Sequence, residues 1–331
     1  MSARRVVVTG GCGFVGSHLV ERLAARGDEV VVFDGAPVPP DLGSDVREHA
    51  RFVDGDIRQP ESLAEAIRPG VEVVFHLAAV VGVDQYLARP LDVIDINFGG
   101  TRNVLELAAK ADARVVVAST SEIFGKNPAV PWPEDGDRVL GPTTADRWAY
   151  SSSKALAEHM TFAFGRQYGL DATTVRYFNV YGPRQRPAYI VSRSVHRALN
   201  KRPPVVYDQG RQTRCFTYVA DVVDGTVLAA ENPAAVGGVF NLGSMDETTV
   251  GEAVRLIREL TGFDSGPIPV DTADKLGPAY EDLGRRVPDN TRARTVLGWT
   301  CGTSLREGLA RTIEWASANR WWLALPDKGA A

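Results

Sequence analysis

The sequence has little of what builds disulfide frameworks or metal centres. Its three cysteines, Cys12, Cys215 and Cys301, are odd in number and far apart, and its five histidines are scattered. A disulfide framework needs paired cysteines, and a zinc site needs ligands at short, regular spacings. We therefore expect reduced thiols in the cytoplasm and no metal site.

Long apolar runs and an excess of positive charge are also absent. No apolar run approaches the length that spans a bilayer, and the first five residues lead straight into a strand-like run with no room for a signal peptide. A net charge of −4 offers no basic field for nucleic acid. We expect a protein that acts on neither membranes nor nucleic acid, with a large core in one or two domains.

Apolar, valine-rich runs alternate with helical patterns through the first half of the chain. The predicted strands are 4–9, 29–34, 51–54, 71–77, 114–119 and 172–178, and the predicted helices are 14–26, 60–68, 91–111 and 147–168. Strands without polar alternation are buried on both faces. The pattern therefore predicts an α/β fold with a Rossmann-type, doubly wound parallel sheet covered by helices.

Proline and glycine become frequent after Tyr181, and the patterns beyond it are shorter and more mixed. They predict strands 205–208 and 238–242 and helices 220–231, 248–262, 291–297 and 303–317. We expect residues 1–180 to form the Rossmann domain and 181–331 mainly a smaller α/β substrate-binding lobe. Segments such as 211–242 are expected to return to the Rossmann domain. Ligands bind at the carboxyl edge of such sheets.

A glycine-rich loop follows the first predicted strand and opens the first predicted helix. Gly10 allows a tight turn, Gly13 lets the backbone approach a pyrophosphate, and Gly16 lets helix and strand pack closely. Phe14 and Val15 begin the helix whose N-terminus faces the negative charge. The loop predicts a dinucleotide-phosphate site, and the alternative is a merely structural glycine turn.

The second predicted strand ends in Asp34, about 20 residues beyond the glycine loop. A carboxylate there accepts hydrogen bonds from the adenosine ribose hydroxyls and repels a 2′-phosphate. The pair of features therefore predicts NAD rather than NADP as the cofactor.

Tyr150 and Lys154 are four residues apart on a predicted helix and hence on one face. A lysine ammonium and a cationic nicotinamide favour the phenolate, so we expect the pKa of Tyr150 to fall from about 10 toward neutrality. Such a tyrosine removes a hydroxyl proton while hydride leaves the same carbon. The alternative is a surface pair without a chemical role.

With these motifs in place, the chain resembles the extended short-chain dehydrogenase/reductases that modify nucleotide sugars. The resemblance covers nearly the whole length. Besides the glycine loop, Asp34 and the Tyr/Lys pair, it rests on Asp56-Ile57, His76–Ala79, Asn97, Ser119–Ser121, Arg176–Pro183, Arg214–Asp221, Arg286–Asp289 and Leu297–Trp299.

The resemblance implies roles for individual residues. It places Asp56 and Ile57 at the adenine, Leu77, Ala78 and Ala79 along the nicotinamide and pyrophosphate path, Asn97, Ser119, Phe178 and Val180 at the cofactor, and Asn179, Arg186, Arg193, Tyr207, Arg214 and Arg286 at the nucleotide sugar. Lys154 also binds the nicotinamide ribose. Arginine forks suit a diphosphate. His76 is expected to be structural, and the relatives imply a homodimer formed by helices after positions 91 and 146.

The stretch Thr120-Ser121-Glu122 bears on the reaction. By resemblance, these enzymes oxidise sugar C4 with NAD and then diverge to epimerise, dehydrate or decarboxylate. Simple epimerases usually carry an apolar or small residue where this chain has Glu122, whereas Thr-Ser-Glu resembles hexuronate decarboxylases and GDP-mannose 4,6-dehydratases. We expect repulsion between Glu122 and a substrate carboxylate to favour loss of carbon dioxide. Alternatively, Glu122 points elsewhere.

The leading hypothesis is a UDP-glucuronate decarboxylase that gives UDP-4-keto-pentose, UDP-xylose or both. Tyr150 is the base, Thr120 its hydrogen-bond partner, and Ser121, Glu122, Lys154 and Arg214 complete the catalytic set. The chain departs from the eukaryotic-type UDP-xylose synthases at one point. Those enzymes usually carry acidic and glycine residues between the tyrosine and the lysine, whereas three serines separate Tyr150 and Lys154 here. The alternatives are a UDP-sugar 4-epimerase, a 4,6-dehydratase, and an NAD-binding sensor without catalysis.

Overall fold

The computed structural model describes residues 3–272, 274 and 283–327. At its centre lies a seven-stranded sheet in the order β11-β6-β5-β4-β1-β2-β3, with every neighbouring pair parallel. The strands are β1 (Arg5–Thr9), β2 (Glu29–Asp34), β3 (Arg51–Asp54), β4 (Val73–His76), β5 (Arg114–Thr120), β6 (Ala172–Tyr177) and β11 (Val239–Leu242). The strand order reverses between β1 and β4, which opens a crevice at the carboxyl edge.

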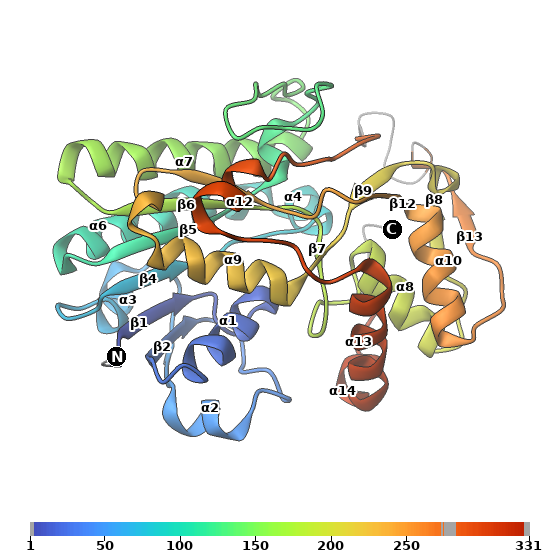
Figure 1. Ribbon diagram of the computed structural model, residues 1–331, viewed down its shortest axis with the longest axis horizontal. Coiled ribbons are helices and arrows are strands. Elements are labelled where there is room, and N and C mark those ends of the chain that lie inside the picture. Colours follow the sequence, from blue (N-terminus) through green and yellow to red (C-terminus); the bar gives the residue numbers. More distant parts are fainter. Residues whose placement is uncertain (1–2, 273, 275–282, 328–331) are drawn as a thin grey trace.

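Helices cover both faces of this sheet (Figure 1). On one face lie α1 (Phe14–Ala24), α2 (Ser44–His49), α9 (Val219–Glu231) and α12 (Thr291–Leu297), and on the other lie α3 (Pro60–Ala66), α6 (Thr101–Ala111) and α7 (Arg147–Tyr168). Two short helices, α4 (Val83–Ala88) and α5 (Pro90–Ile94), precede a π-helical segment, Asp95–Gly100, that leads into α6.

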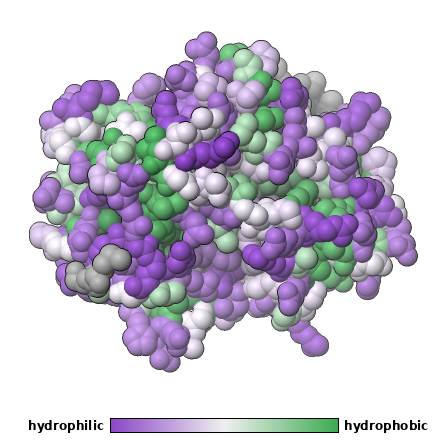
Figure 2. Space-filling model, viewed as in Figure 1, coloured by the Kyte–Doolittle hydropathy of each residue, from purple (hydrophilic) through white to green (hydrophobic). Residues whose placement is uncertain are grey.

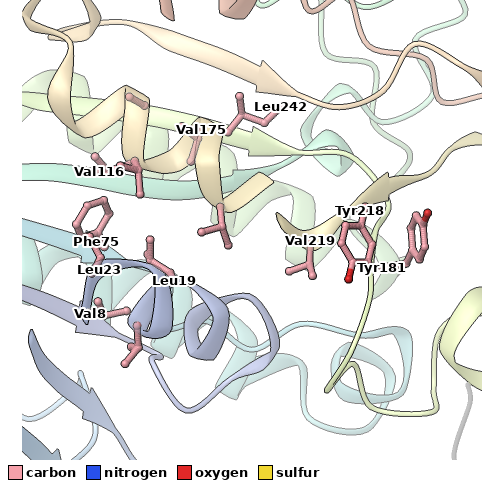
Figure 3. Packing of buried hydrophobic residues seen from close by; sticks show 14 of the residues in the cluster. Val8, Leu19, Leu23, Phe75, Val116, Val175, Tyr181, Tyr218, Val219 and Leu242 are labelled. Carbon is pink, nitrogen blue, oxygen red and sulfur yellow. The ribbon is translucent and has the colours of Figure 1, made fainter. Parts of the chain in front are cut away.

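The alternation of side chains along β1 explains why both faces are covered. Val6 and Val8 belong to one hydrophobic cluster and Val7 to another, and none of the three is exposed. Figure 3 shows Val8 packed near Leu19 and Leu23 of α1 on the first face. A strand that buries both of its faces needs helices on both sides, as the unbroken valine runs predict.

The smaller lobe lies beyond the carboxyl edge of the sheet (Figure 1). Its helices are α8 (Ile190–Leu199), α10 (Val250–Thr261), α13 (Leu305–Ala318) and α14 (Arg320–Leu323), and its strand pairs are β8 (Val205–Tyr207) with β13 (Ile268–Val270) and β9 (Thr213–Cys215) with β12 (Glu247–Thr249). A third pair, β7 (Val180–Tyr181) with β10 (Thr217–Tyr218), leads from the sheet into this lobe.

The structure confirms the predicted α/β fold class and most of the elements, but it corrects one predicted helix and adds another helix. The single helix expected over 91–111 is interrupted by the π-helical segment, which contains Gly99 and Gly100 and turns Asn97 toward the backbone of Val80. Helix α8 was not predicted, because the prolines around it suggested only loop. Strand β11 pairs with β6 although it follows the lobe strands in sequence.

The surface is mixed in character. On the face drawn in Figure 2, hydrophilic residues predominate and hydrophobic residues form separate patches between them. Within the described part of the chain, every helix is too short or too polar to cross a bilayer.

Candidate active site

The glycine loop between β1 and α1 has no room for side chains. Gly10 adopts a positive φ of 73°, and a Cβ there would lie 2.6 Å from the amide nitrogen of Ala78. A Cβ on Gly16 would overlap the carbonyl oxygen of Gly10, and the Gly13 amide donates to that same oxygen at 3.1 Å. The roles assigned to Gly10 and Gly16 from the sequence, a turn and a close approach, match this geometry.

Asp34 closes the loop from the end of β2. Its carboxylate accepts hydrogen bonds from the amides of Cys12 at 2.8 Å and Ala36 at 2.9 Å. Burial raises the pKa of Asp34, and these backbone hydrogen bonds oppose that shift. Asp34 therefore holds the glycine loop against β2 and also faces the cavity.

A cavity of about 1100 Å³ lies along the carboxyl edge of the sheet and continues into the smaller lobe. It exceeds the usual size of a site for one small ligand. Of the residues predicted to form a site, it is lined by Gly10, Gly13, Phe14, Val15, Gly16, Asp34, Asp56, Ile57, Leu77, Ala78, Ala79, Ser119, Thr120, Ser121, Glu122, Tyr150, Lys154, Asn179, Val180, Arg186, Arg193, Tyr207, Arg214 and Arg286.

Two residues predicted at the cofactor do not line this cavity. The Asn97 carboxamide is buried, exchanging hydrogen bonds with the backbone of Val80 at 2.8 and 3.1 Å. Phe178 is fully buried against Phe124 and Trp132. Both side chains are buried beside the cavity and support its walls. Their positions in the sequence do not tell which way the side chains turn, so this orientation could not be predicted.

Tyr150, Lys154 and Thr120 all line the cavity. Tyr150 and Lys154 come from the N-terminal half of α7, and Thr120 ends β5. All three side chains are buried, and Thr120 is hydrogen-bonded to Tyr150. The arrangement places a phenol, its hydrogen-bond partner and an amine in one shielded space, as the sequence predicts.

The electrostatics of the pair differ from the expectation. Burial raises the pKa of Tyr150, and the charge of Glu122 raises it further, while the hydrogen bond with Thr120 opposes both effects. Burial lowers the pKa of Lys154 to about 8, although the charge of Glu158 opposes the shift. The protein groups alone thus disfavour the phenolate, and the expected fall in the tyrosine pKa depends on the positive charge of the nicotinamide.

A buried polar network supports this centre from below. Glu158 accepts two hydrogen bonds from Arg176, at 2.7 and 3.0 Å, and another from the hydroxyl of Ser119. Ser119 therefore lines the cavity while its hydroxyl points to Glu158. His76 bridges Thr9 and Thr101 at 2.8 and 2.9 Å, and burial lowers its pKa to about 3. A neutral histidine between two hydroxyls is structural, as expected.

Glu122 faces the cavity as part of an ion-pair cluster. Arg286 donates to its Oε1 atom, and the Nη2 atom of Arg147 lies 3.9 Å from its Oε2 atom. The alternative that Glu122 points away is thus contradicted. Two cations at this range offset the repulsion that was expected between Glu122 and an anionic substrate. Arg147 was not predicted as a site residue. The one feature of the sequence that could have indicated it is its position three residues before Tyr150.

The remaining arginines differ in how they are held. Arg214 lines the cavity and donates to the carbonyls of Thr213 and Leu283 at 2.7 and 2.8 Å. Arg186 pairs with Asp84 and Arg193 pairs with Asp327. To reach a diphosphate, these two guanidinium groups would have to exchange a carboxylate partner for the ligand.

The end of the cavity inside the lobe is built by the β8–β13 strand pair. It is lined there by Val205, Tyr207, Gln212, Val250 and Thr272. The Tyr207 hydroxyl and the Gln212 side-chain oxygen are buried and make no hydrogen bond within the described residues. Buried polar atoms without a partner are costly, so this end suits a ligand that supplies donors and acceptors.

The Rossmann side of the cavity fits a dinucleotide. A Cβ on Gly10 or Gly16 would collide with the backbone, the start of α1 faces the cavity, and Asp34 lines the cavity at the end of β2. Nothing among the described residues resembles a metal site: no group of three or more histidine, cysteine, aspartate or glutamate side chains is arranged to hold an ion.

Comparisons with known proteins agree with this geometry. The model of the NAD dependent epimerase/dehydratase family matches residues 6–243. The UDP-N-acetyl-alpha-D-glucosaminuronate decarboxylase of Bacillus cytotoxicus is 36% identical over 316 residues, which cover 94% of this chain and 97% of that protein. The UDP-glucuronic acid decarboxylase 1 of Arabidopsis thaliana is 35% identical, over 93% of this chain and 69% of that protein.

Solved structures give the same fold. The UDP-glucose 4-epimerase of Thermotoga maritima, solved with UDP-glucose, has a TM-score of 0.84 and 32% identity, over 94% of this chain and 98% of that one. MoeE5, solved with UDP-glucuronic acid and NAD, has a TM-score of 0.81 and 34% identity over the same shares.

Proposed function

We propose a reaction for this chain from the premise that it belongs to the NAD-dependent epimerase/dehydratase family. NAD is its cofactor, and the glycine loop, Asp34 and Lys154 are the residues that would hold it. We propose that the enzyme decarboxylates a UDP-hexuronate, with UDP-glucuronate as the leading substrate. The curated relatives named above are decarboxylases of UDP-linked uronates, which supports this choice.

One observation carries the proposal: a glutamate side chain in the cavity, bound to an arginine and close to the catalytic tyrosine. Glu122 contacts Arg286, and its charge acts on Tyr150. An enzyme acting on a neutral hexose would not need an arginine–carboxylate pair beside C6 of the sugar. A uronate brings a carboxylate at C6, and an arginine that can turn from Glu122 to the substrate would recognise that group.

The chain's residues divide the work as follows. Bound NAD supplies the oxidation of sugar C4 to a ketone and its later reduction. Tyr150 takes the proton of the C4 hydroxyl, and Thr120 holds the tyrosine in place. The C5–C6 bond then breaks, carbon dioxide leaves, and the bonding electrons move to the C4 oxygen. Tyr150 and Thr120 donate hydrogen bonds to that oxygen.

Glu122 completes the reaction at C5. Before the C5–C6 bond breaks, Arg286 holds the C6 carboxylate of the substrate. The enolate left after carbon dioxide has gone needs one proton at C5, which Glu122 takes from water and passes on. Arg214, which also lines the cavity, grips the diphosphate. Whether the 4-keto pentose or UDP-xylose leaves the enzyme depends on how fast C4 is reduced again.

A second substrate has a specific observation in its favour. The Bacillus relative, which matches almost end to end, is named for the 2-acetamido form of the uronate. The chemistry at C4, C5 and C6 is the same for both sugars, so the same residues would serve. A 4-epimerase remains the alternative reaction, since the Thermotoga neighbour catalyses it.

We also propose a homodimer in the cytoplasm. Leu91 and Ile94 of α5 and Leu156 of α7 are 73%, 41% and 49% exposed, which gives these neighbouring helices an apolar surface. Met160 and Phe164 of α7 pack partly against the protein's own core. The three cysteines are free thiols, which suits a reducing compartment.

The substitution Glu122→Gln tests the proposal, with UDP-glucuronate isotopically labelled at C6 as substrate. The wild-type enzyme should release labelled carbon dioxide. The variant should lose this release by about 100-fold while C4 oxidation persists, seen as NADH absorbance that accumulates without product. Equal rates of carbon dioxide release in both enzymes would remove Glu122 from the mechanism. A new sugar of unchanged mass would show epimerisation instead.

A further inference from the structure

Arg147 is a buried cation in an unfavourable place. It is the first residue of α7, and its side chain is 2% exposed. A helix N-terminus carries a partial positive charge that repels an arginine, and burial removes the water that hydrates the guanidinium group. A buried arginine at this position therefore requires an anion at close range.

Glu122 provides a negative charge there. Its Oε2 atom lies 3.9 Å from Arg147, and its Oε1 atom accepts a hydrogen bond from Arg286. The two cations come from different elements and have different access to ligands. Arg286 lines the cavity together with Glu122, whereas Arg147 does not. Glu122 is thus hydrogen-bonded to one arginine that lines the cavity and lies 3.9 Å from another that does not.

Arg147 also connects this carboxylate to the catalytic base. It lies three residues before Tyr150 on α7, and residues at that spacing share one face of a helix. Glu122 in turn acts on Tyr150 through its charge. Arg147 thus shares a helix with the base and lies near the carboxylate that acts on it.

We propose that Arg147 is a positioning residue that keeps the Glu122 side chain directed at the sugar when Arg286 turns to the substrate. The inference rests on the proposed function, because it assigns Arg286 to the substrate carboxylate. A carboxylate with Arg286 as its one partner would lose its orientation when that arginine moves. A second cation, fixed in α7 and not part of the cavity lining, keeps it in place.

A double-mutant cycle tests this role on purified enzyme with NAD and UDP-glucuronate. Arg147→Gln should lower the rate of carbon dioxide release by about 100-fold and leave KM within about threefold. In an enzyme that already carries Glu122→Gln, Arg147→Gln should lower the rate of carbon dioxide release by less than about threefold, because Arg147 acts through Glu122. Arg147→Lys, which keeps the charge, should recover most of the rate. Losses that multiply independently would overturn the proposal.

Two controls separate this role from a structural one. Arg166→Gln removes an exposed arginine from the same helix and should change no rate. The thermal midpoint of each variant reports folding. If Arg147→Gln fails to fold, Arg147→Lys replaces it in the cycle, and strict additivity with Glu122→Gln again overturns the proposal.

The proposed function can fail separately. A wild-type enzyme that releases no carbon dioxide but forms an epimer refutes decarboxylation. The cycle is then measured on epimer formation, where non-additive losses still support the positioning role and additive losses refute it.

Discussion

Burial of the charged Lys154 side chain destabilises the folded protein. Replacing this lysine with methionine should therefore stabilise the protein while destroying its activity. Burial lowers the pKa of Lys154 to about 8 from an ordinary value of 10.5. The folded state therefore binds this proton less tightly than the unfolded state. Methionine matches the length of the side chain and has no charge to desolvate.

The size and the pH dependence of the effect follow from the two pKa values. Each tenfold change in acid constant is worth about 1.4 kcal/mol, so the full penalty is ~3 kcal/mol below about pH 8. Between about pH 8 and pH 10.5 the unfolded chain still holds the proton that the folded protein has lost, so the penalty shrinks as pH rises. Glu158 keeps its pair with Arg176, so Lys154→Met leaves no unpaired carboxylate.

Urea denaturation at about pH 7 and about pH 10 measures the effect. We expect Lys154→Met to gain roughly 1–3 kcal/mol over wild type at the lower pH and about a quarter of that gain at the higher one. Lys110→Met, at an exposed position on α6, is the matched control and should change little at either pH. A variant less stable than wild type at neutral pH, or a gain independent of pH, would refute the reasoning.

Three further predictions concern the base and the cofactor cradle. Tyr150→Phe should abolish turnover while NAD stays bound, and activity within tenfold of wild type would show that another group is the base. Gly16→Ala should destabilise the fold by about 2 kcal/mol or more and weaken NAD binding, because the added Cβ would overlap Gly10. Calorimetry measures this effect, and Gly43→Ala is the control because the added Cβ there meets open space. Asp34→Asn should narrow the preference for NAD over NADP about tenfold in binding titrations, and an unchanged ratio would mean that the carboxylate does not exclude the 2′-phosphate.

The parts of the site that sequence predicted are those built by neighbours in the chain. The glycine loop needs only a strand, a turn and a helix in order, and its spacing records that geometry. Tyr150 and Lys154 lie one helical turn apart, so their shared face follows from helix geometry. The valine runs likewise predicted a sheet buried on both sides, because their pattern depends on local alternation.

The parts that sequence missed depend on contacts between distant segments. Arg147 and Glu122 are 25 positions apart, and their proximity follows only from the packing of α7 against the turn after β5. The spacing of Tyr150 and Lys154 likewise did not reveal that burial and the charge of Glu122 raise the pKa of Tyr150, so that the expected fall depends on the nicotinamide charge. Asn97 looked like a ligand contact, but the π-helical segment turns it toward the backbone of Val80.

The central claim is loss of the C6 carboxylate after oxidation at C4. The most direct test is the mass spectrum of the sugar nucleotide formed when purified enzyme, NAD and UDP-glucuronate are incubated together. We expect a product lighter than UDP-glucuronate by one carbon dioxide, present as the UDP-linked 4-keto pentose, as UDP-xylose or as both. A product of unchanged mass at a new retention time would contradict it and establish an epimerase.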